Sequence, residues 1–140
     1  MFGTLDHVGV IVRDLDAAVA AACESLGLEV ARSADLPEWS IRARFLGEGK
    51  GNLEIFTFDD PEILEPRLAG LDRRTDHVAF RVDDLESLAA TLRARGVRFC
   101  GPDRGEDALE PIPTGLSLAL WTRPETSGGA GLQFIQPPRD

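Results

Sequence analysis

The sequence DHVGVIVRDL at residues 6–15 decides the fold of this chain, because it recurs as DHVAFRVDDL at residues 76–85. Six of the ten positions are identical in the two copies, which chance does not readily explain. The repeat contains His7 and His77, the only two histidines of the chain. Both copies therefore carry a histidine at the same position, where a metal site shared between two half-domains needs its ligands.

Each copy continues into an amphipathic helix. Apolar residues recur every three or four positions after the repeated stretch, the spacing of a single helix face. The rows are Leu15, Ala18, Val19, Ala22 and Leu26 in the first copy and Leu85, Leu88, Ala89 and Leu92 in the second. Gly27 and Gly96 are typical of the left-handed residue that ends a helix, so we expect the two helices to end there.

Each copy reads as a strand, a helix and three further strands, which predicts an α+β fold. The predicted strands are residues 5–12, 28–33, 40–46 and 52–58 in the first copy and residues 75–82, 97–100, 116–122 and 131–136 in the second. The last strands correspond at an offset of 79 residues, compared with 70 for the histidines, so the second copy contains about ten extra residues. We expect them in an irregular loop from Gly101 to Thr114.

The two copies are expected to form one domain, residues 1–140. Module one covers about residues 4–60, a connection covers 61–73, and module two covers about 74–136. A module of this length buries little surface alone, whereas two packed modules make an ordinary domain. Pseudo-twofold packing of the modules would bring their first strands side by side.

The same packing predicts a metal site. It would make His7 and His77 face one another and would relate Glu54 to Gln133, which lie at matching positions of the last strands. Imidazole nitrogens with carboxylate or amide oxygens suit a borderline or harder divalent ion. We expect Co, Zn, Ni, Mn or Mg, or Fe(II) if the protein is a dioxygenase.

Composition argues against several classes of function. The formal net charge is -9 and Lys50 is the only lysine, which argues against a nucleic-acid surface. There is neither an apolar run of 18 residues nor a basic leader before an apolar stretch, so we expect no membrane span, no secretion signal and a cytoplasmic protein. Cys23 and Cys100 are expected to be buried small hydrophobic residues.

From about Leu5 to Gln136, the chain resembles the vicinal oxygen chelate superfamily, also called the glyoxalase, bleomycin-resistance and extradiol dioxygenase group. The resemblance implies two βαβββ modules that form a cupped eight-stranded mixed sheet with helices outside. It also implies metal ligands on the first and last strands of each module, which are His7, Glu54, His77 and Gln133 here. Many members have Glu at the last position, so Gln133 is a departure that lowers the negative charge of the site.

Within the superfamily the chain is most similar to the methylmalonyl-CoA epimerases. The similar segments are LDHVGV at 5–10, DHVAFRVDD at 76–84 and WTRPETSGG at 121–129. Glu38 follows Pro37 where these epimerases carry an Asn-Pro-Glu whose carboxylate acts as a base, so it is a candidate catalytic base. Glu54 is the candidate for the second proton transfer, because Gln133 does not exchange protons usefully at neutral pH.

The resemblance implies a metal-dependent isomerase or epimerase that transfers a proton at the carbon alpha to a carbonyl. It further implies a small-molecule substrate such as an acyl-CoA thioester, and a homodimer. Two departures argue against coenzyme A. Residues 20–23 replace a common aromatic pair, and the loop 101–114 is acidic. The basic residues left to serve the phosphates are Arg42, Arg44 and Lys50.

Other functions of the same fold stay open. One is a glyoxalase-type lyase, and another is an Fe(II) dioxygenase in which His7, His77 and Glu54 form a facial triad. Gln133 argues against the dioxygenase, because such enzymes usually take the carboxylate from that strand. A third is a non-catalytic binding or resistance protein that sequesters a small molecule, with Trp39 and Trp121 available for stacking.

Overall fold

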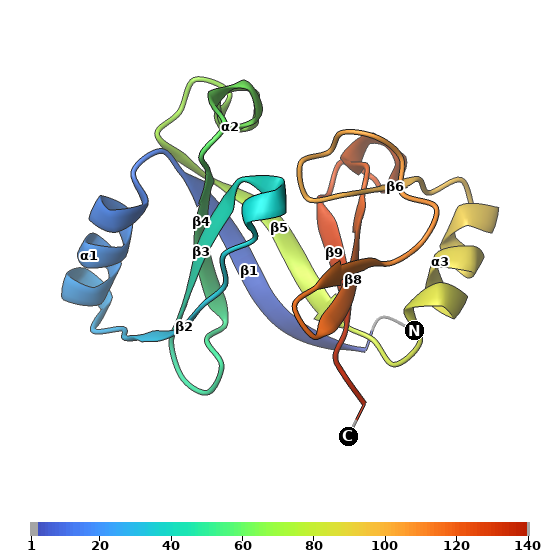
Figure 1. Cartoon of the computed structure of the whole chain (residues 1–140), viewed down its shortest axis with the longest axis horizontal. Helices are drawn as coiled ribbons and strands as arrows, with labels where there is room; N and C mark the ends of the chain where they lie inside the picture. Colours follow the sequence, from blue (N-terminus) through green and yellow to red (C-terminus); the bar gives the residue numbers. More distant parts are fainter. Residues whose placement is uncertain (1–2, 140) are drawn as a thin grey trace. The chain divides into compact units, whose positions relative to one another are not determined.

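The computed structural model describes residues 3–139, in which nine strands form a mixed sheet accompanied by three α-helices (Figure 1). The elements are β1 Thr4–Val12, α1 Leu15–Leu26, β2 Val30–Ser33, the 3-10 helix η1 Pro37–Trp39, β3 Ile41–Leu46, β4 Leu53–Phe58, α2 Pro61–Leu68, β5 Arg73–Arg81, α3 Leu85–Ala94, β6 Phe99–Cys100, β7 Ile112–Thr114, β8 Ser117–Thr122, the 3-10 helix η2 Pro124–Thr126 and β9 Leu132–Gln136. The predicted α+β class is confirmed.

The described residues divide into two compact units. The first half is His7–Asp76, and the second half consists of residues 77–139 together with residues 3–6. Strand order is β2-β3-β4-β1 in the first half and β5-β9-β8-β6 in the second, with β7 paired to β8. In both halves the first strand runs parallel to the last, and the other pairs are antiparallel.

Local sequence signals explain the two predicted helices. The side chain of Asp14 accepts a hydrogen bond from the Ala17 amide and caps α1, and Asp84 caps α3 in the same way through Ser87. Gly27 ends α1 with a left-handed backbone, φ 66°, as the sequence predicted. Leu26 was predicted to continue the apolar row, but it is 65% exposed because the helix ends at that residue.

The sheet in each half has two distinct faces, because successive side chains of a strand point to opposite sides. One face packs on α1 or α3 and is called the helix face. In the first half Val12, Leu46 and Ile55 of this face pack with Leu15 of α1, and in the second half Leu120 and Phe134 pack with Leu85 and Leu88 of α3. Cys100 is buried on the other face, as expected, whereas Cys23 packs on the helix face but is only partly buried, and the two cysteines form no disulfide.

The opposite face, here called the histidine face, bears His7, Glu54 and Phe45 in the first half and His77, Gln133 and Trp121 in the second. Its apolar part differs between the halves. The first half has Ile11, Ile41, Ala43, Phe45, Phe56, Phe58, Leu64 and Leu68 in one cluster of buried residues, whereas the cluster of the second half consists of Cys100, Ala119 and Trp121.

Each of two connecting segments contains a regular element that the sequence did not predict. The connection 61–73 contains α2, whose residues Leu64 and Leu68 cover the histidine face of the first half. The loop Gly101 to Thr114 is not irregular throughout, since its end forms β7 and pairs with β8, which makes nine strands instead of eight. The carboxylate of Asp107 accepts hydrogen bonds from Arg98 and Arg123, which tie the loop to the sheet.

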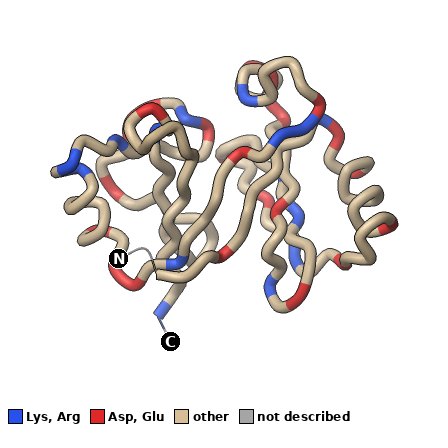
Figure 2. Tube along the Cα trace, turned by 180° about the vertical axis from the view of Figure 1, so that it is seen from behind, with Lys and Arg blue, Asp and Glu red and all other residues tan. Residues whose placement is uncertain are grey.

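Acidic and basic residues are interspersed along the trace (Figure 2). Within residues 3–139, no helix is long and apolar enough to cross a membrane.

Candidate metal centre

His7 and Glu54 meet on the histidine face of the first half. They lie on neighbouring parallel strands, β1 and β4, in which Gly9 is the register partner of Glu54. His7 is two residues before Gly9, so both side chains point to the same face. The His7 Nε2 atom lies 3.5 Å from Glu54 Oε1, and the exposed side-chain fractions are 2% and 13%. This imidazole and carboxylate therefore form a nearly buried pair of potential metal ligands.

The aromatic ring of Phe45 packs beside the His7–Glu54 pair. Phe45 on β3 is the register partner of Glu54, and its ring meets the His7 ring edge to face, with centroids 5.0 Å apart at 88°. Gly51 packs against the Phe45 backbone, where a Cβ would come within 2.7 Å. Any larger residue there would displace Phe45 and with it the wall beside His7.

The second half repeats this arrangement with different side chains. His77 on β5 and Gln133 on β9 are both buried, and the register partner of Gln133 is Ala79, two residues after His77. The antiparallel partner of Gln133 on β8 is Trp121, which occupies the place that Phe45 has opposite Glu54. The two ligand pairs predicted from the repeat therefore have the same strand registers.

Burial distinguishes the predicted ligands from ordinary strand residues. Among the described residues, the polar residues that are buried as a whole are His7, Thr57, His77, Thr122 and Gln133, and the side chains of the ion pair Arg67–Asp76 are also buried. Thr122 is explained by its hydrogen bonds to Ser127 and to the Leu132 amide. Three of the remaining four are predicted ligands. Because burying polar groups costs free energy, their placement calls for a function.

His7 and Glu54 in the first half, and His77 in the second, are residues of the kinds that hold metal ions. Two imidazoles and one carboxylate, with the carboxamide oxygen of Gln133 as a further donor, fit a divalent ion of the borderline or harder kind. The donor set therefore agrees with the metal that the sequence predicted.

Glu38, the candidate base, lies on the exposed turn η1. Pro37 begins this turn and Ser40 ends it in a left-handed conformation, φ 57°. The neighbours Leu36 and Trp39 pack against the apolar cluster of the histidine face. The turn is thus anchored over the face that carries His7 and Glu54, while the Glu38 carboxylate stays in contact with solvent.

The basic residues proposed for phosphates have different surroundings. Arg42 forms an ion pair with Asp59 at 2.9 Å, and Arg44 forms one with Asp35 at 2.7 Å. The Arg44 hydrogen bond holds the pKa of Asp35 below its ordinary value. Lys50 is exposed in the loop between β3 and β4. Two of the three candidates are therefore already neutralised by carboxylates.

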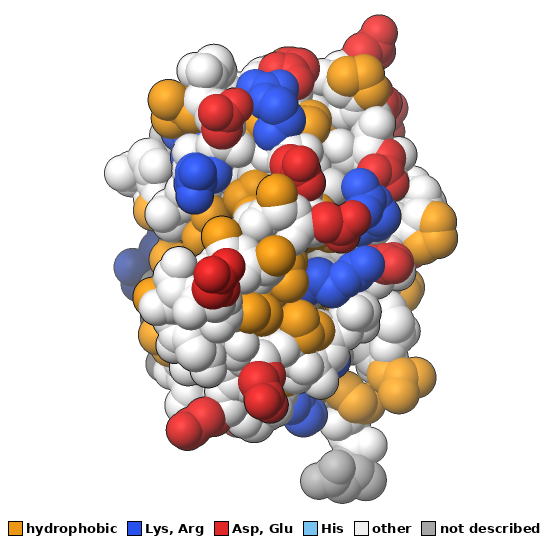
Figure 3. Space-filling model, turned by 90° about the vertical axis from the view of Figure 1, so that its left-hand side faces the viewer, with side chains coloured by type: hydrophobic (Ala, Val, Ile, Leu, Met, Phe, Trp, Pro, Cys, Tyr) orange, Lys and Arg blue, Asp and Glu red, His pale blue; other side chains and the backbone are white. Residues whose placement is uncertain are grey.

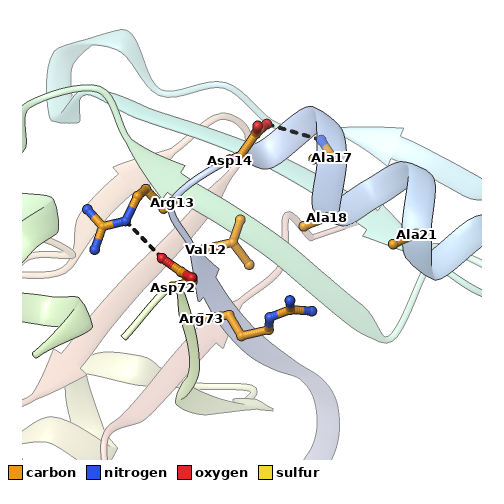
Figure 4. A pocket seen from close by; sticks show the side chains of 8 residues that line it. All are labelled: Val12, Arg13, Asp14, Ala17, Ala18, Ala21, Asp72 and Arg73. Carbon is orange, nitrogen blue, oxygen red and sulfur yellow. Dashed lines mark hydrogen bonds and ion pairs between the residues drawn. The ribbon is translucent and has the colours of Figure 1, made fainter. Parts of the chain in front are cut away.

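A hollow of about 250 Å³ lies on the helix face of the first half (Figure 4). It is lined by Val12, Arg13, Asp14, Ala17, Ala18, Ala21, Asp72 and Arg73. Figure 3 shows the side of the molecule that bears α1, where hydrophobic side chains lie between charged ones. Arg13 is held by Asp72 and Glu65, and the charged residues that line the hollow are exposed, so the hollow lacks the buried polar donors of the histidine face.

A family model for the glyoxalase-like domain matches residues 5–122 of this chain, which is well over half of its length. The chain belongs to the glyoxalase-like domain family. The matched part contains His7, Glu38, Glu54 and His77 but ends before Gln133. No curated protein matches this glyoxalase-like chain.

Solved structures of methylmalonyl-CoA epimerases have the same fold, each with a TM-score of 0.82. The enzyme from Mycobacterium tuberculosis is 23% identical, with 97% of this chain and 89% of that chain covered. A variant of the Streptomyces coelicolor enzyme in complex with 2-nitronate-propionyl-CoA is 22% identical, with coverages of 99% and 100%. A methylmalonyl-CoA epimerase in complex with methylmalonyl-CoA and NH4+ is 23% identical, with coverages of 98% and 96%. The resemblance inferred from the sequence is confirmed.

Proposed function

We propose that this glyoxalase-like protein is a metal-dependent isomerase or epimerase that transfers a proton at the carbon next to a carbonyl group. The observation that carries the proposal is the placement of His7 and Glu54, buried 3.5 Å apart, in the strand register that the other half repeats with His77 and Gln133. A purely structural repeat has no need of four polar side chains on buried strands.

His7, Glu54, His77 and Gln133 would hold one divalent ion. When bound, such an ion supplies Lewis-acid stabilisation of the negative charge that develops on a carbonyl oxygen. The residues themselves orient the donors: Phe45 fixes the His7 ring, and the strand registers fix Glu54 and Gln133. Burial of the histidines also keeps water away from the donor atoms.

Glu38 would remove the proton. Its carboxylate is on a short, anchored turn above the histidine face, so it can approach a substrate from the solvent side while the ligands hold the other side. Glu54 is the candidate for the proton on the opposite face. Gln133 in place of a second carboxylate makes the two proton transfers unequal, because an amide is not a useful acid or base at neutral pH.

The proposed substrate class is an acyl-CoA thioester with a second oxygen group on the same carbon. It is supported by the fold shared with epimerases whose structures contain methylmalonyl-CoA or a propionyl-CoA analogue. By the same analogy, the working unit is proposed to be a homodimer.

The test is exchange of the α-hydrogen of methylmalonyl-CoA in deuterated water, followed by NMR on metal-loaded protein. We expect exchange by the wild type, loss of at least a hundredfold in Glu38→Gln, and unchanged metal content in that variant. Glu29→Gln is the matched control, because Glu29 is also exposed in the first half but lies outside η1. Equal exchange rates in Glu38→Gln and wild type would rule out Glu38 as the base.

The other functions of the fold are distinguished by the same preparation. Turnover of a hemithioacetal without α-exchange of thioesters would indicate a lyase, and oxygen consumption with Fe(II) and a catechol would indicate a dioxygenase. Tight binding of a planar compound by metal-free protein would indicate a sequestering protein. Each of these results replaces the epimerase proposal.

A further inference from the structure

Arg32 is an arginine on the histidine face of the first half that the sequence pattern did not single out. It lies on the edge strand β2, whose four residues are all exposed, and it is the register partner of Phe45. Its guanidinium carbon lies 3.7 Å from the centre of the Phe45 ring. The same ring contacts His7, so a positive charge stands on the far side of the ring next to the proposed ligand.

The guanidinium of Arg32 is held in place but keeps most of its donors. Its Nε–H donates to the carbonyl oxygen of Lys50 at 3.2 Å, and stacking on Phe45 restricts the plane of the group. An arginine has five N–H donors, so four remain on the two terminal nitrogens. Within residues 3–139 these have no hydrogen-bond partner and Arg32 has no ion-pair partner.

Within residues 3–139 Arg32 lacks a carboxylate partner, although the chain has a formal net charge of -9. Many of its arginines are paired with Asp or Glu, namely Arg13, Arg42, Arg44, Arg67, Arg81, Arg98 and Arg123. An exposed, oriented guanidinium with a free pair of terminal nitrogens matches the two oxygens of a carboxylate or phosphate. Because Phe45 separates Arg32 from His7, a substrate held at His7 would need to extend past this ring to bring its anionic group to Arg32.

We infer that Arg32 binds an anionic group of the substrate, a carboxylate or a phosphate, at the edge of the histidine face. The inference rests on the proposed function. Arg32 takes the place of Arg42 and Arg44 as the cation that contacts the substrate, because both of those arginines are paired with carboxylates. Lys50, whose carbonyl holds Arg32, is the only lysine of the chain and lies in the adjoining loop.

Calorimetry with four ligands tests the inference on cobalt-loaded wild type, Arg32→Met, Arg32→Lys and Arg42→Met. Methylmalonyl-CoA has both kinds of anion, methylmalonyl-pantetheine has only the carboxylate, propionyl-CoA has only the phosphates, and malonate has carboxylates without a thioester. Arg42→Met is the matched control, because Arg42 lies on the strand next to β2 but points to the opposite face.

We expect Arg32→Met to weaken methylmalonyl-CoA at least about tenfold, as the loss of a charged hydrogen-bond donor does. Arg32→Lys should fall between it and the wild type, because an ammonium keeps the charge but loses the fork. The affinity of the wild type should also depend more steeply on salt than that of Arg32→Met. A loss that spares propionyl-CoA identifies the carboxylate, and a loss that spares methylmalonyl-pantetheine and malonate identifies the phosphates.

Equal affinities of wild type and Arg32→Met for all four ligands would overturn the inference and leave the proposed function standing. Arg32-dependent binding of malonate without binding of any thioester would support the inference and overturn the substrate class. Binding of no ligand by the wild type would overturn both. If Arg32→Met does not fold or does not load cobalt, Arg32→Lys decides, and its unchanged affinity for every ligand overturns the inference.

Discussion

The two halves of the molecule share a strand plan but differ in what they place on the histidine face. The first half has Glu54, the ring of Phe45 and a large apolar cluster covered by α2. The second half has Gln133, Trp121 and a small cluster, and the chain between β6 and β8 includes β7, where the first half has the turn η1 between β2 and β3. The two halves therefore share the register of their strands but differ in the charge and the apolar packing of the histidine face.

The largest effect should come from removing the ring opposite each ligand. Phe45→Ala and Trp121→Ala should each lower the free energy of unfolding by about 3–5 kcal/mol, because both side chains are buried. Urea denaturation followed by circular dichroism measures the loss. Leu116→Ala, at a residue that is 88% exposed, is the control and should change little. A loss below about 1 kcal/mol in either variant would show that this half lacks a packed histidine face.

The next largest effect should come from changing the charge at the two matching ligand positions, Glu54 in the first half and Gln133 in the second. Glu54→Gln should weaken metal binding at least about tenfold, and Gln133→Glu should strengthen it, because the number of charged ligands tunes affinity. Competition with a chromophoric chelator gives both affinities. If Gln133→Glu also raises the rate of α-hydrogen exchange, the missing second carboxylate limits the reaction. Unchanged metal affinity in both variants would contradict the ligand set.

The smallest effect concerns one aspartate in each half that arginine holds ionised. Hydrogen bonds from Arg44 lower the pKa of Asp35, and those from Arg98 and Arg123 lower the pKa of Asp107. A lowered folded-state pKa gives stability that is complete above the ordinary value of about 3.8 and is lost as the pH falls from there through the folded pKa.

Asp35→Asn and Asp107→Asn should therefore be less stable than the wild type near neutral pH and should converge with it in strong acid. Thermal melts across the acidic range measure the difference. Asp83→Asn is the control, because Asp83 is exposed and has no arginine partner among residues 3–139. A difference that persists in strong acid would mean that the carboxylates act through shape and not through charge.

Much of the fold could be predicted because the same order of strands and helix is written twice in the sequence, so each copy supports the reading of the other. The end of α1 at Gly27 and the two strands that carry His7 and His77 could be predicted directly from the sequence. Helix α2 was missed because Pro61 and Pro66 suggest a loop, although Asp60 before Pro61 is a normal capping signal. Strand β7 is too short to show an alternating pattern.

The candidate site was predictable to a lesser extent. The repeat singles out four ligand positions, and the structure buries His7, His77 and Gln133. Whether the four bind one ion, and whether Glu38 is a base, remain predictions. Arg32 could not be found, because a basic residue on an exposed edge strand looks the same whether its charge is paired or free. Only the positions of Phe45 and Lys50 reveal that difference.

The boundary between the two compact units does not coincide with the boundary between the two sequence repeats. Residues 3–6 belong to the same compact unit as residues 77–139, so the unit boundary passes through β1 and β5 just before His7 and His77. A gene cut in the connection between α2 and β5 would therefore not release two complete units. Each fragment would carry, at the beginning of its first strand, residues that belong to the other unit, and the two fragments would have to associate to restore either unit.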